Sequence, residues 1–171
     1  MKKNNTKFEI LRSIEEAIKE QAYEIFSGLD SDERGEDAAE LAERYEEEIT
    51  EAAWLHIDNL VMYYSDAAEI VAEFGYYTGW EDLQLLSGEC PNNISQLAFA
   101  VIYEQCTEDG ILYGYAWAFE EAQRDYYLTR LEVAIQTQRD KISEHGATPK
   151  EVKKLDQMLT HLEEFKTANN V

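Results

Sequence analysis

Residues 31–53, SDERGEDAAELAERYEEEITEAA, separate into an apolar and an acidic face when they are placed on a helix. The apolar face holds Leu41, Ala42, Tyr45, Ile49, Ala52 and Ala53, and the opposite face holds Glu33, Glu36, Asp37, Glu40, Glu47, Glu48 and Glu51. This division is typical of a surface helix that packs one side on a core. We therefore expect one continuous helix over 31–53 with its carboxylates in solvent.

The charge of this expected helix is dense. It bears two arginines and ten acids, a net charge of −8; the acids are Asp32, Glu33, Glu36, Asp37, Glu40, Glu43, Glu46, Glu47, Glu48 and Glu51. A helix of this length extends about 35 Å, which gives about one net charge per 4 Å. One strand of B-DNA carries a phosphate roughly every 3.4 Å. The similar density suggests a surface that binds a protein built to hold nucleic acid.

Apolar residues recur at three and four along most of the remaining chain. They predict a helix over about 7–27, which Gly28 ends, and Asp30 or Ser31 is suited to cap the next one. The pattern resumes over 54–74, with a break near residue 54 left open. Residues 75–93 are irregular, with room for a short helix over 80–86. Segments 92–107 and 115–127 are also helical in pattern, either as two helices or as one bent helix.

The last part of the chain has apolar residues at a heptad-like spacing. They run over 128–142 and again over 152–162, with a turn at 145–147 between them. Thr148-Pro149-Lys150-Glu151 has the pattern of a capping box with proline in the first turn. We expect two antiparallel helices that pack on the rest of the chain or on a second subunit.

The fold class expected is therefore all-α. An acidic helical bundle over 1–127 forms the body, and a neutral C-terminal antiparallel helical hairpin occupies 128–171. At 171 residues the chain is long enough for one domain with a real core, and we expect a single domain.

The net charge of −21 is confined to the middle of the chain. Residues 29–127 carry three Lys/Arg against twenty-four Asp/Glu, whereas 1–28 carry five against five and 128–171 carry seven against seven. Adaptation to high salt would spread the acids over the whole chain, so segregation favours a binding surface. A polyanion repels nucleic acid and anionic membranes, and no window reaches the length of a membrane span. We expect a cytoplasmic protein that binds neither nucleic acid nor membranes directly.

Motifs of known chemistry are missing from the sequence. There is no phosphate loop, dinucleotide fingerprint or nucleophile elbow, and no Cys or His cluster has metal-ligand spacing. His56, His145 and His161 stand far apart, which favours structural roles. Cys90 and Cys106 are expected to be reduced thiols, because only two are present and no secretory signal precedes them.

Residues 30–35 begin like a calcium loop, but the pattern does not continue. Arg34 occupies the fifth position, and Leu41 stands at the twelfth, where a bidentate Glu is needed. The sequence therefore predicts no metal, no cofactor and no enzymatic activity.

Three short segments resemble the Ocr (overcome classical restriction) family of phage antirestriction proteins, which are all-helical mimics of bent B-DNA. Ala22-Tyr23-Glu24-Ile25 resembles the first helix of that family. Asp58-Asn59-Leu60-Val61 followed by Tyr63-Tyr64-Ser65-Asp66, allowing one deleted residue, resembles the central helix. Ile102-Tyr103-Glu104-Gln105-Cys106-Thr107-Glu108-Asp109 resembles the last helix. The segments occur in the family's order and cover roughly residues 20–125.

The resemblance implies a homodimer whose carboxylates take phosphate-like positions and block the DNA groove of type I restriction–modification enzymes. The acidic positions that carry over are Glu24, Asp58, Asp66, Glu104 and Asp109. The family ends in a very acidic tail, whereas this chain continues into the neutral segment 128–171. The dimer contact of the family has no position on this sequence.

The function expected is that of a phage-type DNA-mimic inhibitor, which occupies the DNA-binding site of a host-defence protein of the restriction–modification or CRISPR type. The expected partner-binding carboxylates are Glu24, Asp32, Glu33, Glu36, Asp37, Glu40, Glu43, Glu47, Glu48, Glu51, Asp58, Asp66, Glu69, Glu73, Glu104 and Asp109. The alternative is a small adaptor or structural phage protein that works through 128–171. That alternative includes an anti-CRISPR protein that acts without DNA mimicry.

Overall fold

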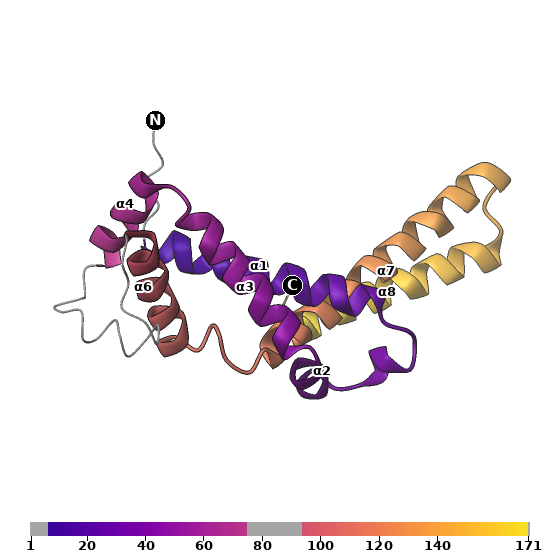
Figure 1. Cartoon of the computed structure of the whole chain (residues 1–171). Coiled ribbons are helices and arrows are strands. Elements are labelled where there is room, and N and C mark those ends of the chain that lie inside the picture. The colour runs from indigo at the N-terminus through magenta and orange to yellow at the C-terminus, as the bar shows by residue number, and fades with distance from the viewer. Residues whose placement is uncertain (1–6, 75–93, 171) are drawn as a thin grey trace.

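The computed structural model describes residues 7–74 and 94–170, and over these ranges it contains helices and no strand (Figure 1). The all-α fold class is thus confirmed. The elements are α1 (Lys7–Gly28), the short 3₁₀ turn η1 (Glu33–Gly35), α2 (Ala38–Arg44), α3 (Glu46–Leu60), α4 (Tyr64–Phe74), α6 (Ile94–Glu108), α7 (Ala116–His145) and α8 (Pro149–Asn169). Residues 75–93 lie outside the described residues, so the expected irregular segment, the short helix expected over 80–86 and Cys90 all fall there.

The continuous helix expected over 31–53 is wrong. The chain forms η1, starts again as α2 and is interrupted at Tyr45, whose φ of −108° and ψ of 16° are not helical. Asp37 causes the first break because its carboxylate caps α2, accepting hydrogen bonds from the N–H groups of Ala39 and Glu40 at 2.9 Å each. The second break turns the half-buried ring of Tyr45 toward Phe119, with ring centroids 6.2 Å apart. The acids of this stretch therefore do not form one straight rod.

Three further positions, where the sequence pattern predicted a helix or left a break open, are defined by the structure. α3 runs through Trp54 without a break, and the chain turns at 61–63 before α4 begins. α6 and α7 are two helices and not one bent helix. Gly110 and Gly114 in the connection have φ of 73° and 58°, a conformation that favours glycine and ends α6.

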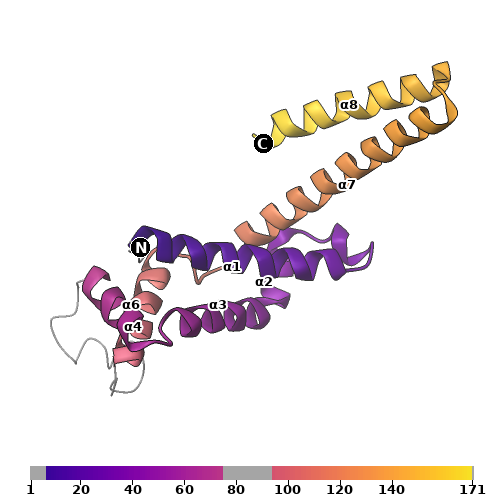
Figure 2. The same cartoon turned by 90° about the horizontal axis from the view of Figure 1, so that it is seen from above.

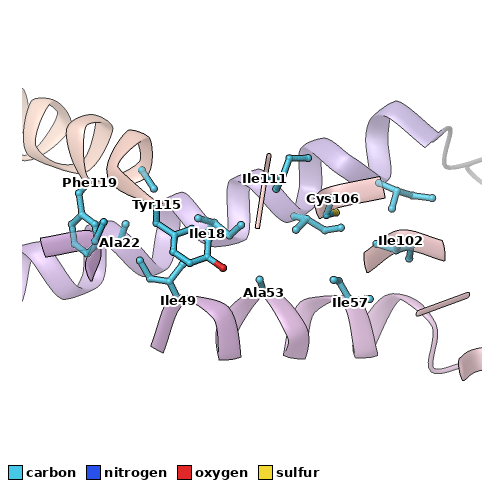
Figure 3. Close-up of a cluster of buried hydrophobic side chains, with 14 of the residues drawn as sticks. Ile18, Ala22, Ile49, Ala53, Ile57, Ile102, Cys106, Ile111, Tyr115 and Phe119 are labelled. Carbon is cyan, nitrogen blue, oxygen red and sulfur yellow. The ribbon is translucent and has the colours of Figure 1, made fainter. Parts of the chain in front are cut away.

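The core lies where α1 and α3 run antiparallel (Figure 3). α1 buries one residue in every four, namely Ile10, Ile14, Ile18, Ala22 and Phe26. α3 buries Ile49, Ala53 and Ile57 in the same core, and α6 buries Ile102 and Cys106 there. Burial raises the pKa of the Cys106 thiol to about 12. Packing at this spacing fixes which side of α3 faces solvent.

α7 connects the body to the C-terminal hairpin. Its first half packs on α1 and α2, and its second half extends away from the body beside α8 (Figures 1 and 2). The segments expected at 115–127 and 128–142 are therefore one helix, and the expected boundary at residue 128 falls inside it. The capping box is confirmed, because Thr148 and Glu151 exchange hydrogen bonds at the start of α8.

Candidate functional site

The expected partner-binding carboxylates are spread over α1, α2, α3, α4, α6 and the turns beside them. Those with exposed side chains are Glu24, Asp32, Asp37, Glu40, Glu43, Glu47, Glu48, Glu51, Asp58, Asp66, Glu69, Glu73 and Asp109. Glu33, Glu36 and Glu104 are partly buried. The structure thus leaves most of them in solvent, but on several helices rather than one.

The clearest alignment of carboxylates is on α3. Glu47, Glu51 and Asp58 share one exposed face, because their spacings of four and seven residues return to the same side of a helix. Glu47 and Glu51 are separated by a rise of about 6 Å, and Asp58 lies about 10 Å farther along. None of the three has a cationic partner among the described residues. We call these three residues the α3 acidic face.

Like charges on neighbouring turns are unfavourable. A pair four residues apart, such as Glu47 and Glu51, lowers helix stability by about 0.2–0.5 kcal/mol. Salt screens this repulsion but does not remove it. The α3 acidic face is therefore held in place by the buried side of the helix, and not by interactions among its own side chains.

Arg44 neutralises part of the acidic stretch. Its guanidinium lies 2.7 Å from a carboxylate oxygen of Glu36 and 3.7 Å from one of Glu33. The hydrogen bond to Glu36 raises the pKa of Arg44. Glu40 and Glu43 line a shallow hollow of about 400 Å³ together with Glu36 and Arg44. Among these acids, Glu33 and Glu36 are the ones whose charge the chain balances itself.

The other two arginines of residues 29–127 are also engaged. Arg34 lies over the ring of Tyr126, 5.0 Å from its centroid, and donates a hydrogen bond to the Tyr126 hydroxyl. Arg124 pairs with Glu121 at 3.2 Å and with Asp125 at 3.5 Å. Both contacts are made on α7, away from the α3 acidic face.

Several expected site residues have duties in the fold. Asp109 accepts a hydrogen bond from the side chain of Gln105 at 3.0 Å, and Glu73 accepts one from the backbone N–H of Lys7 at 3.3 Å. Burial, followed by the charge of Glu108, raises the pKa of Glu104. Asp37, Glu73 and Asp109 therefore make hydrogen bonds within the chain, a distinction that sequence spacing alone does not make.

The sequence pattern also missed an acidic stripe on α1. Glu16, Glu20 and Glu24 are exposed and follow one another at intervals of four residues, although only Glu24 was expected. Arg12, one turn earlier, pairs with Glu16 at 2.9 Å. The spacing of four was the available signal, and the neutral charge count of residues 1–28 concealed it.

The histidines lie apart in the structure as well. His56 is partly buried, and its Nε2 lies 3.1 Å from the hydroxyl of Ser13. That hydroxyl donates to the carbonyl oxygen of Ile10, so the ring Nε2–H is the donor to Ser13. Burial lowers the pKa of His56. His145 and His161 are exposed on the hairpin.

Within residues 7–74 and 94–170, no group of three or more His, Cys, Asp or Glu side chains is arranged to hold a metal ion. In the same part of the chain, no helix combines the length and the apolar character needed to cross a membrane. No protein-family model, curated protein sequence or solved structure matches the chain.

Proposed function

We propose that this protein is a phage-encoded DNA mimic without enzymatic activity, which acts in the host cytoplasm. It inhibits a DNA-binding host-defence protein, a type I restriction–modification enzyme or a CRISPR-type complex, by occupying its DNA-binding site. The observation that supports this most is the α3 acidic face, which has no cationic partner within residues 7–74 and 94–170, where Arg34, Arg44 and Arg124 are all engaged elsewhere. A partner with a basic groove would supply the missing positive charge.

The mechanism would be electrostatic and preorganised. Ile49, Ala53 and Ile57 hold α3 against α1, so its carboxylates need no ordering when the partner binds. Lysine and arginine side chains that normally meet phosphates would meet carboxylates instead. Affinity should fall as salt rises, with a shallower slope than for DNA, because a protein lacks the condensed counterions that DNA releases.

A capture experiment tests this proposal. The immobilised protein is incubated with host lysate, and the bound proteins are challenged with duplex DNA and with salt. A DNA mimic loses its partner to duplex DNA, whereas a partner bound elsewhere on the chain is indifferent to it. Release by salt without competition by DNA would count against mimicry.

Matched variants locate the surface. Replacing Glu40, Glu47 and Glu51 with Gln removes three charges from α2 and α3, and binding should weaken at low salt. The control replaces Glu144, Glu163 and Glu164, which are exposed glutamates of the hairpin, with Gln. Each lost contact should also reduce the salt slope, by less than the roughly one unit that a phosphate contact of DNA contributes. Equal loss in both variants would indicate a general effect of net charge and would overturn the proposed site.

A second candidate function is that of an adaptor that binds a protein through the hairpin. It is favoured by α8, which has no fully buried residue, so the apolar Leu155, Leu159 and Leu162 are only partly buried. Replacing Lys153 and Lys154 with Glu changes the exposed charge of α8 while leaving α3 intact. An adaptor loses its partner in this variant, and a DNA mimic keeps it.

The family resemblance further implies a homodimer. Analytical ultracentrifugation at several protein concentrations measures the mass directly and separates a dimer from a monomer.

A further inference from the structure

The exposed side of α3 changes character along the helix. Its first half presents Glu47 and Glu51, and its second half presents Trp54 and Leu55 with 45% and 62% of their surfaces exposed. The exposed side chain of Met62 follows in the turn after α3. Exposed apolar side chains that lie together on one face are typical of interaction sites.

Trp54 is held in a fixed orientation by its contact with α6. Its ring meets the ring of Tyr103 on α6 edge to face, with centroids 6.5 Å apart and an interplanar angle of 61°. Tyr103 in turn stacks on Phe99 with centroids 6.3 Å apart. The indole is therefore anchored on α6 and still leaves nearly half of its surface for a partner.

Carboxylates stand on both sides of this ring. Glu51 precedes Trp54 by one turn and Asp58 follows it by one turn, and both are exposed on the same face of α3. A second copy of the chain meeting this face through a two-fold axis would bring the carboxylates of Glu51 and Asp58 against the same carboxylates of the other copy. Charge complementarity therefore favours a basic partner over self-association at this position.

The type of basic side chain follows from the aromatic ring. A guanidinium is planar and stacks on an aromatic face while its N–H groups donate to a carboxylate, whereas a lysine ammonium is a compact, strongly hydrated point charge. The chain already makes this contact internally, because Arg34 and Arg130 lie 5.0 Å and 5.8 Å from the ring centroid of Tyr126.

We infer that Trp54 is an arginine-docking point on the α3 acidic face. An arginine of the partner's DNA-binding groove stacks on the indole and donates hydrogen bonds to Glu51 or Asp58, while Leu55 contacts the aliphatic part of its side chain. This inference rests on the proposed function, and it adds that the partner's groove is recognised through arginine rather than lysine.

Calorimetric titration of the 171-residue protein with an arginine homopeptide and a lysine homopeptide of equal length tests the inference. The wild-type protein should prefer the arginine peptide by about threefold, the preference expected of one exposed cation–π contact. Trp54→Leu should bring the ratio close to one without changing the affinity for the lysine peptide. Trp54→Phe, which keeps an aromatic ring, should retain the preference.

The outcomes separate the inference from the proposed function. If Trp54→Leu keeps the wild-type ratio, the arginine-docking point is wrong. A second variant, Trp54→Gln, gives the same readout if circular dichroism shows that the leucine variant is unfolded. If Glu40→Gln, Glu47→Gln and Glu51→Gln together leave both peptides bound as tightly as before, the acidic surface itself fails, whatever Trp54 does.

Discussion

The hydroxyl groups of Thr50 on α3 and Tyr115 at the start of α7 lie 2.8 Å apart, within hydrogen-bond distance. Tyr115 is only 1% exposed and sits between α1 and α3 in the core (Figure 3). Burial raises the pKa of Tyr115, so the phenol stays neutral and keeps its proton for this contact. The bond fixes α3, and with it the α3 acidic face, to the helix that leads into the hairpin.

Tyr115→Phe should lower the free energy of unfolding. The substitution removes the hydroxyl but keeps the ring. The decrease in the free energy of unfolding, about 1 kcal/mol, therefore measures the loss of the hydrogen bond, which leaves the Thr50 hydroxyl without this partner. Urea denaturation followed by circular dichroism measures the change. Tyr113→Phe is the matched control, since Tyr113 is 77% exposed and its variant should unfold like the wild type. Equal stability of the two variants would contradict a structural role for this bond.

Glu47→Gln combined with Glu51→Gln should stabilise the isolated protein. Removal of the repulsion between adjacent turns is expected to raise the free energy of unfolding by about 0.2–0.5 kcal/mol at low salt. The gain should shrink as salt is added, because exposed charges are screened. Thermal denaturation at two salt concentrations measures it.

The same double variant should bind its partner less well. A variant that gains stability while losing affinity is the pattern expected of a surface kept for binding at some cost in stability. Glu163→Gln with Glu164→Gln on α8 is the control and should leave binding unchanged. Loss of both stability and binding in the α3 variant would instead indicate a structural role for these carboxylates.

His56 should make stability depend on pH. Burial lowers its pKa below the ordinary value of about 6.5, so the unfolded chain binds its proton at a higher pH than the folded chain. The contribution of neutral His56 to stability is therefore fully present above pH 6.5 and is lost as pH falls through its folded pKa. Protonation also places a partly buried charge beside Ser13.

The measurement compares wild type and His56→Gln by urea denaturation between pH 8 and pH 5. The difference between their free energies of unfolding should change with pH, with the wild type losing more stability than the variant on acidification. His161→Gln is the control, since His161 is exposed on α8. A pH-independent difference between wild type and His56→Gln would contradict the assignment.

The periodic segments were predictable because burial repeats with the helix. The recurrence of Ile14, Ile18 and Ala22 at intervals of four residues predicts α1, and all three are buried in the core. The capping box at 148–151 was equally readable, because both of its hydrogen bonds are local. The break at Tyr45 was not, since it depends on contact between that ring and Phe119, which lies far along the chain.

The acidic surface was only partly predictable for the same reason. Counting charges located the acid-rich segment 29–127, but it treated every carboxylate alike. Arg44 pairs with Glu36, whereas Glu47 and Glu51 have no cationic partner among the described residues. Pairing depends on the fold bringing a guanidinium within reach, and sequence spacing does not contain that information.

The sequence by itself determined the all-α class and the confinement of negative charge to residues 29–127, because both follow from composition and local periodicity. The tertiary structure decided that the acid-rich stretch bends at Tyr45 and that Glu47, Glu51 and Asp58 share an open face beside Trp54. The physical reason is that contacts between residues far apart in the sequence determine which side of a helix is buried and where the helix ends. The direction in which the charges point is therefore a property of packing, and not of the segment that carries them.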